Sequence, residues 1–390
     1  MSETAAATIR SIAMLEKLVA FDTVSRKSNL AFIDFVQGLL KGHGIESRLV
    51  YNDERTKANL LATIGPKVPG GIVLSGHTDV VPVDGQDWHT NPFSVVERDG
   101  RLYGRGTADM KCFLAIALAA LDTMKAAPLK TPLHFAFSYD EEVGCLGAPS
   151  LIRFLSQELP APRAVIVGEP TDMKVVSAHK GITTVRTTVT GHESHSSQTH
   201  RGVSAVMYAA ELIQYLRGLN EEAAARGPNN PLFEPTHTTL TVNVIEGGTA
   251  INIMAGQCVF QWDVRALPED NPDRYVRRFM DHCAREVLPR MRAIAPTCNI
   301  ETTLRSGTPA LKPDPESEAE QLCRVLTGDN VTRAVSFAAE AGQFQQKGMA
   351  TVICGPGSIS QAHQPNEYIE ISQVEAGTKF MLDLVRHLSR

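Results

Sequence analysis

Short apolar, strand-like runs recur along this chain, and an acid or a histidine stands at or just past the end of each. In an open α/β sheet, ligands bind in the crevice outside the carboxyl ends of the strands. Five separate segments that deliver oxygen and imidazole groups to one such edge predict a metal centre. The residues concerned are His77 with Asp79, Asp109, the run Asp140-Glu141-Glu142, Glu169 and His363.

The length and composition bound the class of protein. At 390 residues the chain exceeds the size at which a single core stops growing, so we expect two domains. A hydrophobic content of 43% and a charged content of 21% are ordinary for a soluble globular protein. The net charge of -5, without any basic run, argues against a nucleic-acid partner.

Two further features concern the cellular compartment. The first residues lack the basic start and apolar core of a secretion signal, and the most apolar stretch, 113–121, is too short to span a bilayer. We therefore expect a cytoplasmic protein that makes no membrane contact. The seven cysteines include no Cys-x-x-Cys pair, so we expect buried, reduced thiols and no thiolate zinc site.

Strand and helix patterns alternate through the first half of the chain. Helical spacing covers residues 8–20 and 30–42, and a long apolar-faced helix is expected over 110–125. Strands are expected at 46–51, 59–64, 71–74, 133–138 and 164–168, with a helix over 148–155. This alternation predicts an α/β fold with a mixed, mostly parallel sheet flanked by helices.

The pattern changes after Lys180-Gly181. Strand-like segments at 182–189, 238–245 and 258–264 accompany helical segments at 204–216 and 273–287. They predict a small α+β domain over residues 182–296, inserted into the first. The catalytic domain would then consist of residues 1–181 and 297–390, completed by segments at 317–327, 350–354 and 374–388.

His77 and Asp79 stand two positions apart, so on a continuing strand their side chains point the same way. A metal-bound imidazole needs its second ring nitrogen held, and a carboxylate is a standard partner. We interpret His77 as a ligand and Asp79 as its orienter, although Asp79 could ligate instead. Taken alone, a His-x-Asp pair is more often a surface pair.

Asp109 lies in a glycine-bearing loop that opens a helix. An aspartate there is commonly only a helix N-cap. However, capping requires neither the two glycines of this loop nor Arg105. A carboxylate at this position can bridge two metal ions at the separation of roughly 3.5–4 Å found in two-metal sites.

Three adjacent acids directly after a strand, Asp140-Glu141-Glu142, repel one another unless a cation lies nearby. One glutamate can then bind metal while its neighbour serves as general base. A solvated turn would suit the charges but not the apolar run before them. The five candidates His77, Asp109, Glu142, Glu169 and His363 would provide each of two ions with an imidazole, a carboxylate and a shared aspartate. This set suits zinc, and cobalt or manganese would also fit.

Four motifs resemble the zinc-dependent aminoacylase/carboxypeptidase superfamily, which also contains amino-acid deacetylases and desuccinylases. They are GHTDVVP at 76–82, YGRGTADMK at 103–111, DEEVG at 140–144 and GEPT at 168–171. Further stretches match the deacetylases best, and the resemblance covers nearly the full chain. These lie at 178–181, 195–197, 201–203, 263–268, 355–359 and 361–368.

The resemblance implies a metallo-exopeptidase-like catalytic domain with two divalent ions. One would be held by His77 and Glu169, the other by Glu142 and His363, with Asp109 between them. Glu141 would be the general base in hydrolysis of the amide of an N-acyl amino acid. The inserted domain would be a lid that mediates a homodimer.

The resemblance also implies substrate contacts. His195 of the lid would reach into the partner subunit's site and stabilise the oxyanion there. Arg265 and Asn252 would bind the substrate. As a separate hypothesis, Glu340 pairs with an ammonium group on the substrate side chain. Two departures from the pattern are Cys112, where glycine is usual, and Glu193, where a small residue is usual.

Three functions remain open at this point: deacetylation, another acyl-amino-acid or dipeptide hydrolysis, and binding without catalysis. A panel of acyl and peptide substrates would separate the first two. Loss of Glu141 or of any ligand would have favoured the third, and all six residues are present.

Overall fold

The computed structural model describes residues 2–390 and divides the chain into two compact units. The first unit combines the residues up to 178 with 311–333 and 339–390. The second contains residues 179–310 and 334–338. The second unit runs past the expected boundary at residue 296, because a strand over 299–308 belongs to its sheet. The inserted segment is therefore longer than its sequence pattern indicated.

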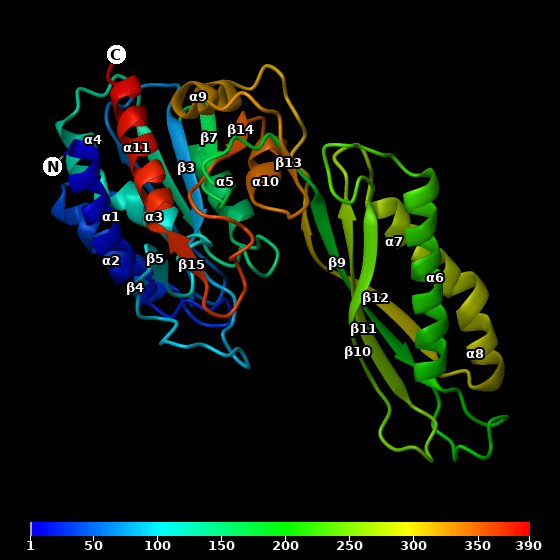
Figure 1. Cartoon of the computed structure of the whole chain (residues 1–390). Helices are drawn as coiled ribbons and strands as arrows, with labels where there is room; N and C mark the ends of the chain where they lie inside the picture. The colour runs from blue at the N-terminus through cyan, green and yellow to red at the C-terminus, as the bar shows by residue number, and fades with distance from the viewer. Residues whose placement is uncertain (1) are drawn as a thin grey trace. The chain divides into compact units, whose positions relative to one another are not determined.

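A six-stranded sheet forms the centre of the first unit (Figure 1). The strands lie in the order β1-β2-β6-β3-β7-β14, with β6, β3, β7 and β14 parallel and β2 and β1 antiparallel at one edge. This confirms the predicted mixed, mostly parallel sheet. The bounds are β1 Ser47–Tyr51, β2 Ala58–Ile64, β3 Ile72–His77, β6 Leu133–Ser138, β7 Ala164–Val167 and β14 Thr351–Ile353.

Helices cover the central sheet. Helices α1, α3 and α11 pack on one another, and α3 contacts β3, whereas α5 packs on β2 and β6, and α10 on β7 and β14. Every residue of α3 except the last is buried, as expected for a helix that is apolar all round. The bounds are α1 Glu3–Val19, α2 Leu30–Gly42, α3 Lys111–Ala119, α4 Leu121–Ala126, α5 Ala148–Glu158, α9 Glu318–Thr327, α10 Ala341–Gln346 and α11 Ile371–Leu388.

A small antiparallel sheet, in the order β15-β5-β4, brings the C-terminal segment beside the loop before α3. Its strands are β4 Val96–Arg98, β5 Arg101–Tyr103 and β15 Tyr368–Glu370. This pairing matters for the site, because His363 and Asp109 lie in the two segments that it joins. The two-residue strands β8 Ala178–His179 and β13 Ala334–Val335 lie where the chain passes between units.

The second unit is a four-stranded antiparallel sheet with helices on one face (Figure 1). The strand order is β10-β11-β9-β12. Burial alternates along β9 and β11, as expected for strands with one face on a core. The bounds are β9 Gly181–Thr190, β10 Thr239–Gly247, β11 Gln257–Ala266, β12 Asn299–Thr308, α6 Ala205–Arg226, α7 Asp273–His282, the π-helix η1 Cys283–Val287 and α8 Leu288–Ile294.

Two chemical features follow from the packing. All seven cysteines are buried and none forms a disulfide, as the spacing of the cysteines led us to expect. Within residues 2–390, no helix combines the length and apolar character that crossing a bilayer requires.

Candidate metal centre

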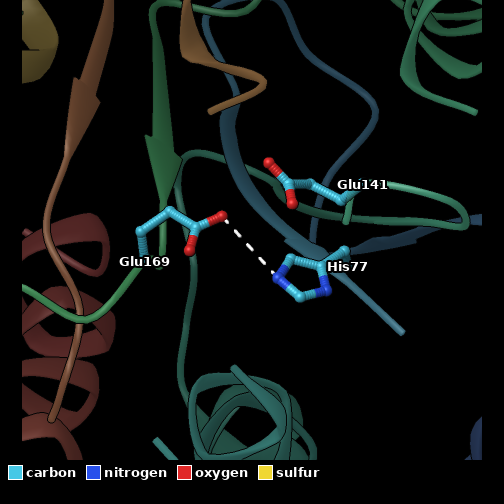
Figure 2. A group of neighbouring side chains, drawn as sticks. All are labelled: His77, Glu141 and Glu169. Atoms are coloured by element: carbon cyan, nitrogen blue, oxygen red, sulfur yellow. Dashed lines mark ion pairs between the residues drawn. The ribbon is translucent and has the colours of Figure 1, made fainter. Parts of the chain in front are cut away.

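The carboxyl ends of three neighbouring parallel strands meet at the candidate site. Strand β3 ends at His77, β6 ends two residues before Asp140, and β7 ends two residues before Glu169. Because β6, β3 and β7 are adjacent and parallel, these ends lie along one edge of the sheet. Figure 2 shows the carboxylates of Glu141 and Glu169 close to the His77 ring, with a dashed line joining Glu169 to the imidazole.

Asp109 lies between the two histidines. Its Oδ1 is 3.0 Å from His77 Nε2, and its Oδ2 is 3.4 Å from His363 Nε2. Each oxygen of one buried carboxylate therefore faces a different imidazole. This is the arrangement that a bridging ligand requires.

The remaining carboxylates divide between the histidines. Glu169 Oε1 lies 3.8 Å from His77 Nε2, and Glu142 Oε2 lies 2.9 Å from His363 Nε2. Donor atoms of His77, Glu141 and Glu169 lie within 4.8 Å of one another, as do those of His77, Asp109 and Glu142. The structure thus brings together all five predicted ligands and the predicted base.

The chemistry of the donors fits a divalent metal. Glu142 Oε1 and Glu169 Oε1 are buried and have no hydrogen-bond partner in the part of the chain that the structure describes. Leaving a buried polar atom unpaired costs free energy, which a coordinated cation would offset. Imidazole nitrogen with carboxylate oxygen is a donor set that zinc, cobalt and manganese accept.

The electrostatics of the site also call for a cation. Burial raises the pKa of Glu141 and of Glu169 well above the usual range, and raises the pKa of Glu142 to about 7. Burial also opposes ionisation of Asp109, but hydrogen bonds from the two histidines outweigh it and lower the pKa of that carboxyl. Hydrogen bonds to Asp109 and Glu142 raise the pKa of His363 to about 10.

Asp79 contacts more than its predicted partner. His77 Nδ1 lies 2.9 Å from the Asp79 carbonyl oxygen and 3.6 Å from its carboxylate. The carboxylate accepts the backbone N–H groups of Glu141 at 3.1 Å and Glu142 at 3.3 Å, and the Ser25 hydroxyl at 2.6 Å. Asp79 therefore holds the imidazole through its backbone and the acidic turn through its side chain.

Cys145, which is not among the predicted site residues, contacts the predicted base. Its Sγ lies 3.2 Å from Glu141 Oε1, and its backbone N–H donates to the Glu141 carbonyl at 2.8 Å. The only signal in the sequence was the four-residue spacing between the two, which becomes a contact when the segment turns.

Glu340 is placed differently from its predicted role. It is 1% exposed, and its carboxylate accepts the hydroxyls of Ser138 on β6 and Ser75 on β3, the latter at 3.2 Å. These bonds occupy both carboxylate oxygens of Glu340. Contact with a substrate ammonium group stays a prediction, and the structure supports a buried structural role instead.

The three predicted lid residues lie in the second unit. His195 is exposed, and the N–H of the next residue, Ser196, donates to the Asn252 carbonyl at 3.0 Å. Arg265 lies on β11, with Nε 3.7 Å from Asp263 Oδ1. The segments carrying His195 and Asn252 are thus adjacent, and the substrate roles of all three residues stay predictions.

Several known proteins resemble this chain, some in sequence and others in fold. An acetylornithine deacetylase of Proteus mirabilis is 33% identical over 380 residues, covering 97% of this chain and 95% of the relative. One from Myxococcus xanthus is 35% identical over 367 residues, or 93% of each chain. The M20 family metallo-carboxypeptidase Sso-CP2 of Sulfolobus solfataricus has the same fold, with a TM-score of 0.78 at 18% identity over the full length of both chains. The sequence profile of peptidase family M20/M25/M40 matches residues 73–387, and the chain belongs to this family of hydrolases.

Proposed function

We propose that this chain is a two-metal amidohydrolase that converts N2-acetyl-L-ornithine to ornithine and acetate, a step of arginine biosynthesis. The observation that carries the proposal is the single buried carboxylate of Asp109 facing both His77 and His363. The similarity to acetylornithine deacetylases over nearly the whole chain supports the choice of substrate.

Five residues would hold the two ions. His77 with Glu169 and His363 with Glu142 are the two terminal pairs, and Asp109 is shared. Zinc is the expected metal, and cobalt is a workable substitute. When bound, the ions would lower the pKa of a water molecule and polarise the scissile carbonyl.

Glu141 is the proposed general base. Its carboxylate lies beside His77 and Glu169 but is not needed to complete either terminal pair (Figure 2). It would take a proton from the attacking water as the C–O bond forms. It would then return that proton to the leaving α-amine as the amide C–N bond breaks.

The second unit would complete the site. We propose that it forms a homodimer and that His195 donates to the oxyanion in the partner's site. Arg265 would hold the substrate carboxylate, for which a guanidinium offers a bidentate pairing, and Asn252 would assist. The exposure of His195 is compatible with such a role.

A substrate panel tests the reaction. Purified protein supplied with zinc or cobalt would be assayed on acetylornithine, an acetylated apolar amino acid, succinyl-diaminopimelate and a dipeptide. We expect the highest kcat/KM on acetylornithine. A higher value on the succinyl or peptide substrate would reassign the chain within the same family. No turnover of any substrate by protein containing two ions would indicate a binding protein.

Mixed dimers test the role of His195. Chains carrying Glu141→Gln and chains carrying His195→Ala would be inactive separately. If His195 acts in the partner's site, each mixed dimer contains one complete site, so a random mixture regains up to about a quarter of the wild-type activity. If His195 acts within its own chain, neither site of a mixed dimer is complete and the mixture stays inactive.

A further inference from the structure

We propose that Arg105 and Glu367 form a buried positioning pair that fixes the positions of the ligands Asp109 and His363 relative to each other. The inference rests on the proposed two-metal centre and adds to it. Both side chains are 1% exposed, and Arg105 Nη1 donates to Glu367 Oε2 at 2.7 Å. Neither residue is among the predicted ligands, and neither contacts substrate in the proposed reaction.

His363 needs support from outside its own segment. Its side chain is 52% exposed, unlike the buried ligands around it. Its backbone φ is 63°, in the left-handed region that non-glycine residues adopt only when the surrounding structure holds them there. A loop histidine in this conformation does not keep a metal-binding geometry by packing alone.

Glu367 holds the other ligand. Its Oε1 accepts the backbone N–H groups of Ala108 at 2.9 Å and Asp109 at 3.1 Å. A carboxylate that accepts two backbone N–H groups fixes the direction of that backbone, because the two bonds constrain it together. Glu367 thereby fixes the backbone position from which the Asp109 side chain extends.

Arg105 connects this point to the His363 loop. Its Nη1 also donates to the Gln364 carbonyl at 3.3 Å, and its Nη2 donates to Gln86 Oε1. Gln86 Nε2 in turn donates to the His363 carbonyl at 2.9 Å. One guanidinium thus connects, directly or through Gln86, to the carbonyls of both His363 and the residue after it.

The loop that contains Gln86 encloses the network. The Arg105 guanidinium lies over the Trp88 ring at 5.1 Å, and Trp88 Nε1 donates to Gln86 Oε1 at 3.0 Å. The next residue, His89, donates its N–H to Asn366 Oδ1 at 2.8 Å. The planar, five-donor shape of arginine is what allows contacts to three acceptors at once, and a lysine would not reproduce it.

A neighbouring ion pair offers a matched control. Arg101 and Glu370 pair across strands β5 and β15, Nε to Oε1 at 2.9 Å, in the same two segments. Their side chains are 41% and 42% exposed, and they make no contact with Asp109 or His363 among the described interactions. This pair joins the same strands without contacting a ligand.

The test compares Glu367→Gln, Arg105→Lys and Arg105→Met with Glu370→Gln. Each purified protein would be titrated with Co²⁺ after metal removal, following the visible spectrum, and its metal content measured after zinc loading. We expect the first three variants to bind both ions more weakly, because Asp109 is shared, and to weaken the ion held by His363 most, by roughly 10- to 100-fold. His363→Ala should weaken mainly the same ion, while Glu370→Gln should bind both ions as wild type does.

The conservative Glu367→Gln keeps the shape of the side chain, so it should stay folded if Arg105→Met does not. Melting temperatures of the metal-free proteins report folding separately. Two ions bound by a folded Glu367→Gln with wild-type affinities would overturn the inference and leave the two-metal centre intact. Equal weakening of both ions, with a lowered melting temperature, would mean a purely structural pair and would also overturn it. Fewer than two ions on wild type would refute the proposed centre itself.

Discussion

The carboxylate of Asp79 accepts the backbone N–H of Glu141 at 3.1 Å, although the two residues follow different strands. Asp79 lies just past the end of β3, and Glu141 lies in the turn after β6, its parallel neighbour. The side chain that was predicted to orient an imidazole thus also determines where the predicted base stands. This hydrogen bond connects the segment after β3 directly to the turn after β6.

Replacing Asp79 should therefore disturb the base more than it disturbs metal binding. In Asp79→Asn the charge that attracts two backbone N–H groups and the Ser25 hydroxyl is lost. We expect kcat to fall roughly 10- to 100-fold with at most a small loss of metal. Steady-state kinetics with metal analysis on the same sample would check this. Asp84→Asn, which alters an exposed ion pair with Arg26, is the control and should change neither.

Glu141 and Glu142 should separate into a base and a ligand. Glu141→Gln cannot accept a proton, so we expect kcat to fall by at least about 100-fold with two ions still bound. Glu142→Gln removes the carboxylate that lies 2.9 Å from His363, so we expect it to lose one ion. Kinetics and metal content measured together distinguish the two. If Glu141→Gln loses an ion while Glu142→Gln keeps both, the two roles are exchanged.

Cys145 should affect turnover without affecting metal content. Its thiol lies 3.2 Å from Glu141 Oε1, where it can donate and so orient the base. Cys145→Ala removes that donor, and we expect kcat to fall about 3- to 10-fold, in line with the loss of one hydrogen bond from a weak thiol donor, worth roughly 1 kcal/mol. Cys145→Ser should recover most of the loss. A similar deficit in both variants would show that the size of the sulfur matters and the hydrogen bond does not.

The ligands could be predicted because parallel strands place their carboxyl ends at one edge whatever the rest of the fold. His77, Glu142 and Glu169 depend only on that rule and on the neighbouring positions of β3, β6 and β7. Asp109 and His363 lie off the strands, and were predicted from a glycine-bearing loop that opens a helix and from a preceding apolar run. The pairing of β5 with β15, which joins their segments, has no signature in local sequence.

The supporting residues could not be predicted, because their hydrogen-bond partners lie in distant segments of the chain. Ser25 bonds a carboxylate 54 positions away, and Glu367 bonds N–H groups more than 250 positions away. Only tertiary packing brings these donors and acceptors together. The end of the second unit also could not be predicted. Strand β12 is mostly exposed or half-exposed and lacks the apolar alternation that reveals a strand.

Metal binding should release protons, and its affinity should rise with pH. In the metal-free chain the pKa of Glu142 is raised to about 7 by burial and the pKa of His363 to about 10 by its hydrogen bonds, so both hold a proton at pH 6. A cation must displace those protons to reach its ligands. We expect a net release of protons at pH 6 when both ions bind, from these two groups and from His77 and Glu169, whose pKa values are also raised.

Calorimetric titration in buffers with different ionisation enthalpies measures that release directly. The raised pKa of Glu142 also implies that its contribution to the stability of the metal-free chain is present below pH 4.5 and is lost as pH rises through about 7. Binding enthalpies that do not depend on the buffer would contradict the release of protons. Glu54→Gln, at an exposed surface position, is the matched control and should release as many protons as wild type.

His134 should make stability depend on pH in a separate part of the first unit. It lies on β6 with Nδ1 2.9 Å from Thr63 Oγ1, and burial lowers the pKa of its imidazole to about 4. In the unfolded chain the group takes up a proton near pH 6.5, so between that pH and about 4 the unfolded state binds more protons. The free energy of unfolding should therefore fall as pH falls through this window.

The shift corresponds to a loss on the order of 3 kcal/mol across the window, since each pKa unit is worth about 1.4 kcal/mol. His134→Gln keeps a hydrogen-bonding side chain that does not titrate, so its unfolding free energy should fall less steeply between pH 6.5 and 4. Denaturant unfolding of both proteins at several pH values isolates the difference, because all other titrating groups are common to both. His89→Gln, at an exposed position, should follow the wild-type curve. Parallel curves for His134→Gln and wild type would mean that the buried imidazole is protonated in the folded chain.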